Sequence, residues 1–331
     1  MKAVRYYGIQ DVRCEEIAKP QCGSGEVLIR VAYAGICGSD LHIYNKQMFI
    51  QNIPETMGHE FVGIIEECGA EVKGFKPEDR VIANPMVTCG ECEGCRKGLP
   101  NTCAELGFIG EVRPGCFAEY IVLEPEALIP VPKEADLKQE ALAEPLAVVL
   151  NLCERADLCP EDEIAIIGAG PISLLTIIAA KSIYGVKSVY VCGRSAMRLE
   201  LAGRVGADYV DTVLPENKKF DKVIEIAGRE ATFNMAVEHT QPNGTLCVVS
   251  IFEDEFIVDL NLLVASQIRF IGCNAYERRH LEDAVRVIAE GKVDVTPLIS
   301  AEYDLAECAK AFEALNEKDK TVAKILFSMS D

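Results

Sequence analysis

The sequence predicts an α/β protein in two parts, a compact β domain followed by a doubly wound parallel sheet. Its 331 residues exceed what one hydrophobic core usually organises, so two domains are expected. Near residue 162 the pattern changes from short strands and turns to strands that alternate with helices, which is typical of a parallel sheet with crossover helices. A glycine-rich turn at residues 168–173 follows the first of these strands.

The β domain is predicted over residues 1–145. Residues 26–33 alternate polar and apolar side chains, as a half-buried strand does, and residues 61–68 and 80–84 are also strand-like. The spacer at residues 23–25 consists of glycine and serine, which favour turns. This half is therefore expected to be a β domain that carries loops.

The parallel sheet is predicted over residues 146–275, and a C-terminal segment over residues 276–331. The strands of the sheet are expected at residues 163–167, 188–192, 221–226, 245–251 and 269–273, and its helices at residues 172–183, 195–205 and 231–240. The C-terminal segment is expected to hold helices at residues 280–290 and 305–316 and a strand at residues 323–327.

Composition excludes several classes of partner. The formal charge is −19, and an acidic surface repels phosphate backbones and anionic lipids, so neither nucleic acid nor a membrane is expected as a partner. Residues 164–180 form the longest apolar run, but Gly168, Gly170 and Pro171 interrupt it as a turn and helix start would. The 15 cysteines are mostly scattered and residues 1–10 lack an apolar signal segment, which predicts a reducing compartment, the cytoplasm.

Four cysteines form the most specific motif of the chain, with the spacing C-x₂-C-x₂-C-x₇-C. They are Cys89, Cys92, Cys95 and Cys103. Two-residue gaps let a tight turn direct several thiolates at one point, and four thiolates close a tetrahedral shell around zinc, so the site is predicted to be structural. The alternatives are a disulfide pair, an iron–sulfur cluster or coincidence. The polar spacers argue against coincidence, and electron-transfer clusters use other spacings.

The glycine-rich turn predicts a dinucleotide site. Its residues are Gly168, Gly170, Pro171, Ile172 and Ser173. The first glycine allows the turn, and the second lets a pyrophosphate approach the helix N-terminus. Ser173 stands where a third glycine is usual, and its small side chain is expected to preserve the packing of helix on strand.

The end of the second strand predicts the cofactor. An NAD site carries an acid there to hold the ribose 2′-hydroxyl, whereas this chain has Gly193, Arg194 and Ser195. A guanidinium and a hydroxyl suit a 2′-phosphate, so NADP is favoured over NAD. The alternative is that Arg194 is a solvated surface residue, in which case NAD remains the cofactor.

A second set of metal-ligand side chains is open rather than closed. Cys37 and His59 offer sulfur and nitrogen, and Glu60 or Glu144 offers a carboxylate oxygen. A catalytic zinc needs about three protein ligands and one position for water or substrate. Taken singly, each of these residues has an ordinary structural explanation, but their occurrence beside a Cys₄ motif and a nucleotide fold favours a catalytic zinc.

With these motifs in order, the chain resembles the zinc-containing medium-chain dehydrogenases/reductases of the alcohol dehydrogenase superfamily. The segments that carry the resemblance are residues 37–42, 58–60, 89–103, 115–120, 144–146 and 168–173. The resemblance implies a GroES-like catalytic domain completed by the C-terminal segment, a Rossmann domain, an active site in the cleft between them, and assembly as homodimers or homotetramers.

The resemblance to the polyol (sorbitol-type) branch also implies roles for single residues. Cys37, His59 and Glu60 match the catalytic-zinc ligands, and Glu144 matches a carboxylate that can exchange with Glu60. Ser39 matches the hydroxyl that passes the substrate proton, and His42 matches the outer end of this relay. Asp40 is expected to orient His59.

The expected substrate is a secondary alcohol on a polyol, sugar acid or sugar phosphate. Residues 42–45, 72–76 and 113–120 resemble threonine 3-dehydrogenases, so oxidation of an amino alcohol is the alternative. An alternative of another class is a non-enzymatic zinc or redox protein on a dehydrogenase scaffold. Such a protein would be expected to lose relay or ligand residues, and all of them are present in this sequence.

Overall fold

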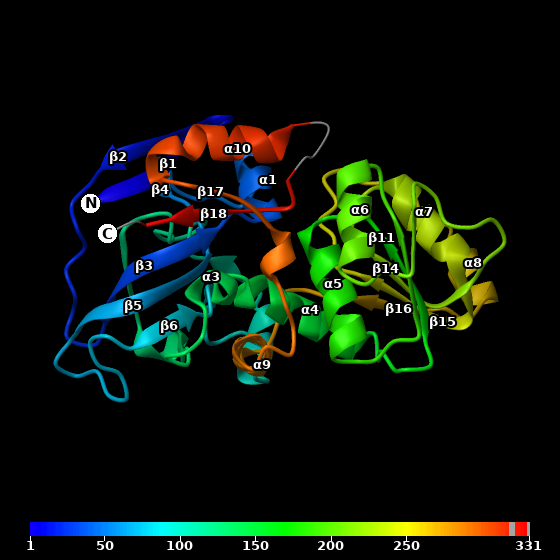
Figure 1. Cartoon of the computed structure of the whole chain (residues 1–331), viewed down its shortest axis with the longest axis horizontal. Helices are drawn as coiled ribbons and strands as arrows, with labels where there is room; N and C mark the ends of the chain where they lie inside the picture. The colour runs from blue at the N-terminus through cyan, green and yellow to red at the C-terminus, as the bar shows by residue number, and fades with distance from the viewer. Residues whose placement is uncertain (318–321, 330–331) are drawn as a thin grey trace.

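The computed structural model describes residues 1–317 and 322–329 and contains two large sheets of different kinds (Figure 1). The first is a mainly antiparallel sheet of seven strands in the order β10-β6-β5-β3-β18-β17, with β9 also paired to β3. These strands are β3 (Val27–Gly35), β5 (Glu60–Cys68), β6 (Arg80–Ala83), β9 (Tyr120–Leu123), β10 (Leu128–Pro130), β17 (Ile299–Tyr303) and β18 (Lys324–Ser328).

Two smaller sheets and short helical turns accompany it. The smaller sheets consist of β1 (Lys2–Gly8), β2 (Asp11–Glu16) and β4 (Glu55–Thr56), and of β7 (Met86–Val87) and β8 (Gly107–Phe108). Short helical turns are α2 (Glu93–Arg96), η1 (Pro100–Thr102), η2 (Pro125–Ala127), η3 (Thr296–Leu298) and η4 (Leu305–Glu307).

A helix that the sequence pattern did not reveal, α1 (Gly38–Lys46), packs beside α10 (Cys308–Asn316) next to the first sheet. The rings of Tyr44 and Phe312 lie 5.0 Å apart between the two helices. Helix α1 begins directly after Cys37, so it carries the 37–42 motif on its first turns.

The second large sheet is parallel, with six strands in the order β13-β12-β11-β14-β15-β16. This order places β11 and β14 side by side at the centre, where the crossover connections change direction and ligands bind in such sheets. The strands are β11 (Glu163–Ile167), β12 (Ser188–Cys192), β13 (Tyr209–Asp211), β14 (Phe220–Glu225), β15 (Thr240–Val248) and β16 (Arg269–Gly272). The helices of this part are α5 (Pro171–Ser182), α6 (Ala196–Arg204), α7 (Glu230–His239) and α8 (Leu260–Ala265).

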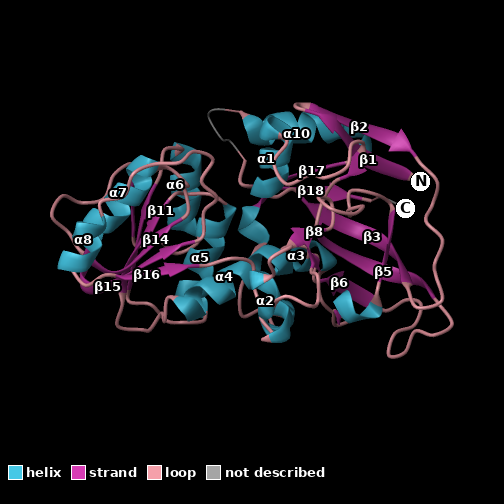
Figure 2. Cartoon of the chain, turned by 180° about the vertical axis from the view of Figure 1, so that it is seen from behind, coloured by secondary structure: helices cyan, strands magenta, loops and turns pink. Residues whose placement is uncertain are grey.

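Helix α4 (Ala143–Arg155) lies between the two large sheets (Figure 2). It contacts β5 of the first sheet, α5 of the second part, and α9 (Arg278–Ala289), while the short helix α3 (Leu137–Glu140) precedes it. Its side chains Leu146, Val149 and Leu150 belong to one core that includes residues of both parts. The position of Glu144 in the first turn of α4 therefore depends on packing from both sides.

The predicted fold class is confirmed. Strands β11 and β12 have the bounds that the sequence pattern predicts, whereas β15 begins at Thr240, five residues before the predicted 245–251, because its first residues pair with β14 ahead of an irregularity. The helix predicted at 305–316 begins as the 3₁₀ turn η4 and becomes α-helical at Cys308. Among the described residues, every helix is too short or too polar to span a lipid bilayer.

Candidate active site

The four motif cysteines converge in the loop between β7 and β8, which we call the knuckle (residues 89–103). Their sulfur atoms all lie within 4.8 Å of one another. The backbone N–H groups of Cys89 and Cys92 donate to the sulfurs of Cys103 and Cys89, each at 3.4 Å. The N–H of Ala104 donates to Cys92 Sγ at 3.5 Å. Amide groups directed at sulfur stabilise thiolates, which are the ligand form of cysteine.

The donor set of the knuckle fits zinc. None of the 15 cysteines, all of which lie within the described residues, takes part in a disulfide, so the disulfide alternative is not realised in this structure. Backbone N–H groups lower the pKa of Cys92 to about 6, whereas burial and the neighbouring thiols raise the pKa of Cys95 to about 11. Four close thiols of which at least one ionises near neutral pH match a closed structural zinc site.

A second group of metal-ligand atoms is assembled from two separate positions in the chain. Cys37 precedes α1, Glu60 is the first residue of β5, and His59 comes directly before it. Their ligand atoms lie within 4.8 Å of one another. Gly58 makes the approach possible because it has φ +94° and a Cβ at this position would overlap the ring of Phe117. We call Cys37, His59 and Glu60 the open centre.

Asp40 lies next to the open centre and is almost fully buried. Its Oδ2 accepts a hydrogen bond from Cys37 N at 2.8 Å, and its Oδ1 lies 4.0 Å from His59 Nδ1, which is an ion-pair distance rather than a hydrogen bond. Burial by itself would lower the pKa of His59, but Cys37, Asp40 and Glu144 outweigh this effect and hold that pKa well above its usual range. The groups around His59 therefore favour a positive charge at this position.

Glu60 is held by a buried lysine that the sequence analysis missed. Lys324 of β18 pairs with Glu60 Oε2 and donates a second hydrogen bond to the carbonyl of Ile36 at 3.0 Å. The other oxygen, Glu60 Oε1, is buried and has no hydrogen-bond partner among the described residues. A carboxylate oxygen without a donor, beside a thiol and an imidazole, fits a bound cation.

Glu144 lies outside the close group that Cys37, His59 and Glu60 form. The hydroxyl of Tyr276, itself fully buried, donates to Glu144 Oε1 at 2.8 Å. Burial raises the pKa of Glu144 to about 7, although the charge of His59 opposes this shift. In this structure Glu60 is therefore the carboxylate nearest the other two ligands, and Glu144 is a second carboxylate held by a tyrosine.

The two predicted relay residues lie on α1. Ser39 is half-buried one residue before Asp40, and His42 is one turn further along the helix. His42 Nδ1 donates to Glu253 Oε1 at 2.9 Å, and Lys46 lies 4.0 Å from the same carboxylate. Glu253 belongs to the loop after β15, so this contact joins the first sheet's helix to the parallel-sheet part.

The glycine-rich turn connects β11 to α5 at the centre of the parallel sheet. Gly168 has φ +116°, which favours glycine, and its N–H donates to Cys192 O at 2.8 Å. No atom lies within 4 Å of where a Cβ of Gly170 would stand, so the backbone before α5 is open to a ligand. Pro171 is the first residue of α5, followed by Ile172. Ser173 is fully buried, in line with the small-residue packing that the sequence predicts.

The residues after β12 surround the same turn. A Cβ at Gly193 would lie 2.8 Å from the Cβ of Ala169, so an acid at position 193 requires the turn to move. Ser195 caps α6 by accepting a hydrogen bond from Arg198 N at 3.3 Å. Arg194 is exposed. Position 193 therefore lacks the acid, and its backbone packs so closely on the glycine-rich turn that a side chain there would require a shift.

Three residues of the site were missed by the sequence analysis: Lys324, Tyr276 and Glu253. Lys324 left a signal, because it is the only charged residue in the apolar strand 323–327. Tyr276 and Glu253 lie in loops whose pattern contains no such signal. They reach the site only through the packing of distant segments.

The comparisons with known proteins agree with this architecture. The alcohol dehydrogenase GroES-like domain family matches residues 23–133, and the glucose dehydrogenase C-terminus family matches residues 141–325. The chain is 29% identical to sorbitol dehydrogenase of Bacillus subtilis, over 99% of this chain and 97% of that protein. It is 32% identical to 2-dehydro-3-deoxy-L-galactonate 5-dehydrogenase of Pseudoalteromonas atlantica, over 94% of each. It is also 30% identical to L-threonine 3-dehydrogenase of Marinomonas, over 91% of this chain and 92% of that protein.

Two solved structures are similar over nearly their whole length. A zinc-binding dehydrogenase from Sinorhizobium meliloti bound to NADP has a TM-score of 0.92 and 27% identity, with 99% of each chain covered. An alcohol dehydrogenase from Escherichia coli CFT073 in complex with NADH has a TM-score of 0.93 and 26% identity, again with 99% of each chain covered. The chain belongs to the zinc-containing medium-chain dehydrogenase/reductase family, in its polyol dehydrogenase-like branch, and is an alcohol dehydrogenase enzyme.

Proposed function

We propose that this enzyme transfers a hydride between a secondary alcohol of a polyol, sugar acid or sugar phosphate and NADP, at a zinc held by the open centre. The observation that carries this proposal is the convergence of Cys37, His59 and Glu60, with ligand atoms within 4.8 Å of one another, although 21 residues separate Cys37 from the other two in the chain. The unpartnered Oε1 of Glu60 supports a cation there. When bound, zinc supplies Lewis-acid chemistry that lowers the pKa of a substrate alcohol.

The protein's own part in the reaction is to hold and move a proton. The Ser39 hydroxyl, on the first turn of α1, is the candidate first acceptor of the alcohol proton. His42 follows on the same helix, and its side chain is 24% exposed, so a proton that reaches its ring can leave to solvent. Glu253 fixes the ring through Nδ1. This arrangement supports a path from Ser39 to His42 to water.

The nucleotide is proposed to lie across the carboxyl ends of β11, β12 and β14. Gly170 leaves the N-terminus of α5 open for a pyrophosphate. Arg194 and Ser195, directly after β12, offer a guanidinium and a hydroxyl to a 2′-phosphate, and no carboxylate occupies position 193. The two similar structures hold NADP and NADH respectively, so the preference for NADP rests on these residues.

The cofactor preference is tested by fluorescence titration of NADPH and NADH. Arg194→Ala is expected to weaken the binding of NADPH by roughly ten- to a hundredfold with little change in the binding of NADH, because a charge-assisted pair contributes about 1.5–3 kcal/mol. Arg204→Ala, an exposed arginine at the end of α6, is the matched control. Tighter binding of NADH by the wild type would show that NAD is the cofactor. Gly193→Asp is not a clean test, because its Cβ would press on Ala169.

The substrate class is tested with a panel of polyols, sugar acids, sugar phosphates and L-threonine, each assayed with both cofactors. The proposal expects the highest kcat/KM on a polyhydroxylated secondary alcohol. A clear preference for L-threonine would establish the amino-alcohol alternative instead. The absence of turnover on every compound by protein that carries its metal would favour a non-enzymatic role.

We also propose that the enzyme is a homodimer or homotetramer of the reducing cytoplasm. Val264 and Leu260 of α8 are 74% and 63% exposed, and Phe270 of the edge strand β16 is 50% exposed, so this edge of the parallel sheet is apolar and unpaired within the described chain. Phe270→Glu is expected to yield monomers by light scattering. The free state of all the cysteines supports a reducing compartment.

The proposed division of the chain is a catalytic domain over residues 1–145, a nucleotide-binding domain over residues 146–275 and a segment over residues 276–331 that completes the catalytic domain. The pairing of β18 with β3 supports the last assignment, because it inserts the end of the chain into the first sheet. Lys324 of the same strand reaches Glu60. On this division the open centre requires the C-terminal segment.

A further inference from the structure

The segment from Cys273 to Glu277 connects the last strand of the parallel sheet to α9 and contains a strained residue. Ala275 has φ +43°, a left-handed conformation that non-glycine residues rarely adopt, and it is 9% exposed. Such backbone strain persists only where the surroundings hold it, and it commonly occurs at functional sites. The contacts around Ala275 show what holds it and what the turn achieves.

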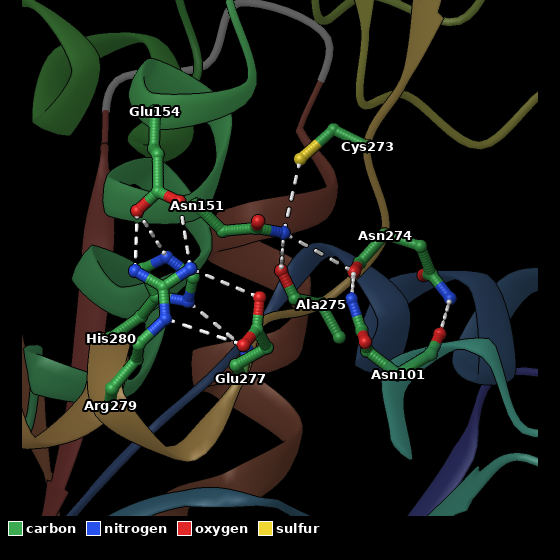
Figure 3. A network of polar contacts seen from close by, with 9 residues as sticks. All are labelled: Asn101, Asn151, Glu154, Cys273, Asn274, Ala275, Glu277, Arg279 and His280. Carbon is green, nitrogen blue, oxygen red and sulfur yellow. Dashed lines mark hydrogen bonds and ion pairs between the residues drawn. The ribbon is translucent and has the colours of Figure 1, made fainter. Parts of the chain in front are cut away.

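The first support comes from the knuckle (Figure 3). Asn101, two residues before the ligand Cys103, donates from Nδ2 to the carbonyl of Asn274 at 3.0 Å. Asn274 returns the contact from its own Nδ2 to the carbonyl of Asn101 at 2.9 Å. This reciprocal pair ties the backbone on one side of Ala275 to the Cys₄ loop.

The second support comes from α4. Asn151, which is 4% exposed, donates to the carbonyl of Ala275 at 2.7 Å, and its Nδ2 also lies 3.5 Å from Asn274 O and 3.4 Å from Cys273 Sγ (Figure 3). One turn further along α4, Glu154 pairs with Arg279 through contacts of 2.5 and 2.7 Å. The segment is therefore anchored on α4 before and after Tyr276.

The turn at Ala275 directs the next side chain inward. Tyr276 is fully buried, and its hydroxyl donates to Glu144 Oε1 at 2.8 Å. Glu144 and Asn151 are seven residues apart, so they lie on the same face of α4 two turns from each other. One helix face thus holds both the strained turn and the carboxylate that Tyr276 reaches.

We propose that Tyr276 is a positioning residue for Glu144 and that the knuckle, through the Asn101–Asn274 pair and the strained turn at Ala275, holds it in place. The inference rests on the proposed function, because it takes Cys37, His59, Glu60 and Glu144 as the surroundings of a catalytic metal. On this inference, the Cys₄ loop helps to hold Tyr276 in place in addition to forming its own local structure. Residues that orient carboxylates around a metal commonly change metal affinity or activity by 10- to 100-fold when they are removed.

The test measures zinc release from the holoenzyme to a chromogenic chelator, which needs no turnover. Zinc from the open centre and zinc from the knuckle are expected to be released in two kinetic phases. Cys37→Ser identifies the open-centre phase, since that phase should disappear while the knuckle phase remains. Tyr276→Phe, which removes only the hydroxyl, is expected to speed the open-centre phase by roughly tenfold and to leave the knuckle phase unchanged. Tyr6→Phe is the matched control, because the Tyr6 hydroxyl is buried without a hydrogen-bond partner.

The link to the knuckle is tested by Asn274→Ala, which deletes the donor to Asn101, with Asn52→Ala at an exposed loop position as the control. Asn274→Ala is expected to speed the open-centre phase several-fold and to add nothing in the Tyr276→Phe background. This second variant also decides the proposal if Tyr276→Phe fails to fold, since an unchanged open-centre phase would then overturn it.

The remaining outcomes separate the inference from the proposed function. A normal open-centre phase in Tyr276→Phe overturns the positioning role. Additive effects of the two substitutions overturn the link through Asn274. If Cys37→Ser shows the same phases of zinc release as the wild type, the proposal of a catalytic zinc at the open centre is wrong. The inference then fails because its metal site does not exist, and not because Tyr276 has no positioning role.

Discussion

The knuckle and the open centre both bring metal-ligand side chains together, but they are built in different ways. The knuckle takes four sulfurs from one loop of 15 residues, and backbone N–H groups of this loop and of Ala104 donate to three of them. The open centre takes Cys37 from the start of α1 and His59 and Glu60 from the start of β5. Around it lie Asp40, Glu144, Tyr276 and, from the end of the chain, Lys324.

This difference separates a candidate metal site formed by a local segment from one formed by tertiary packing. The knuckle needs only its own loop to bring its ligands together, and three of its four cysteines are partly exposed. The region of the open centre buries several charged groups at once, and Glu60 and Glu144 have their partners on distant segments of the chain. Substitutions in the knuckle and in the open centre are therefore expected to differ in whether they affect stability or activity.

The first prediction contrasts Cys37→Ser with Cys89→Ser. Elemental analysis of the wild type is expected to find about two zinc ions per chain. Cys37→Ser should abolish turnover and lose one ion while the fold is retained, whereas Cys89→Ser should lower stability or disturb assembly. A wild-type content of one ion that Cys89→Ser leaves unchanged would contradict the two-site proposal.

The second prediction concerns the proposed proton transfer, which has no counterpart in the knuckle. Ser39→Ala is expected to keep zinc and nucleotide but to reduce kcat by about 10²–10⁴-fold, the usual contribution of positioned proton transfer. Steady-state kinetics and a zinc assay measure both properties, and Ser24→Ala in an exposed turn is the control. A near-normal kcat in Ser39→Ala would mean that water or another group carries the proton.

The third prediction tests the buried charges. Lys324→Met removes the partner of Glu60 while keeping an unbranched side chain. Measured on metal-free protein, it is expected to lower the free energy of unfolding by about 3–5 kcal/mol, because a buried carboxylate with neither a lysine nor a metal ion beside it remains. Lys310→Met is the control, since that lysine is 70% exposed beside Glu307 and should change stability by less than about 1 kcal/mol. Chemical denaturation measures both, and equal effects would show that the Glu60 pair is not essential to the fold.

The fourth prediction uses Glu140 of α3 as an internal reference for a buried carboxyl without a partner. It is fully buried, neither of its oxygens has a hydrogen-bond partner among the described residues, and burial together with nearby Asp136 raises its pKa to about 8. The folded protein therefore keeps a proton that the unfolded chain releases near pH 4.5. The loss of folding stability caused by burying Glu140 is absent below that pH, grows as the pH rises, and is complete above about pH 8.

Glu140→Gln is thus expected to raise the free energy of unfolding by on the order of 3 kcal/mol at pH 8.5 and by little at pH 4. Denaturation curves at several pH values measure the difference, with Glu134→Gln at an exposed position as the control. A gain that is the same at every pH would show that titration of Glu140 does not cause it. Unlike Glu140, Glu60 of the open centre has Lys324 as a partner, and the neighbouring Glu144 has Tyr276.

Features that depend on neighbours in the chain were predictable from sequence. The spacing of the four cysteines indicated the knuckle, because short gaps alone bring the sulfurs together. The alternation of strands and helices after residue 162 predicted the parallel sheet, and β11 and β12 have the predicted bounds. The glycine-rich turn was predicted for the same reason, since φ +116° at Gly168 is a local requirement.

Other features were decided only by the tertiary structure. The sequence contains Lys324, Tyr276 and Glu253, but nothing in their neighbourhood says that they meet Glu60, Glu144 and His42. Each contact joins segments more than 130 residues apart. The physical reason is that a buried charge or hydroxyl is satisfied by whichever distant element packs against it, and packing depends on the whole chain, whereas turns and ligand spacings depend on a few consecutive residues.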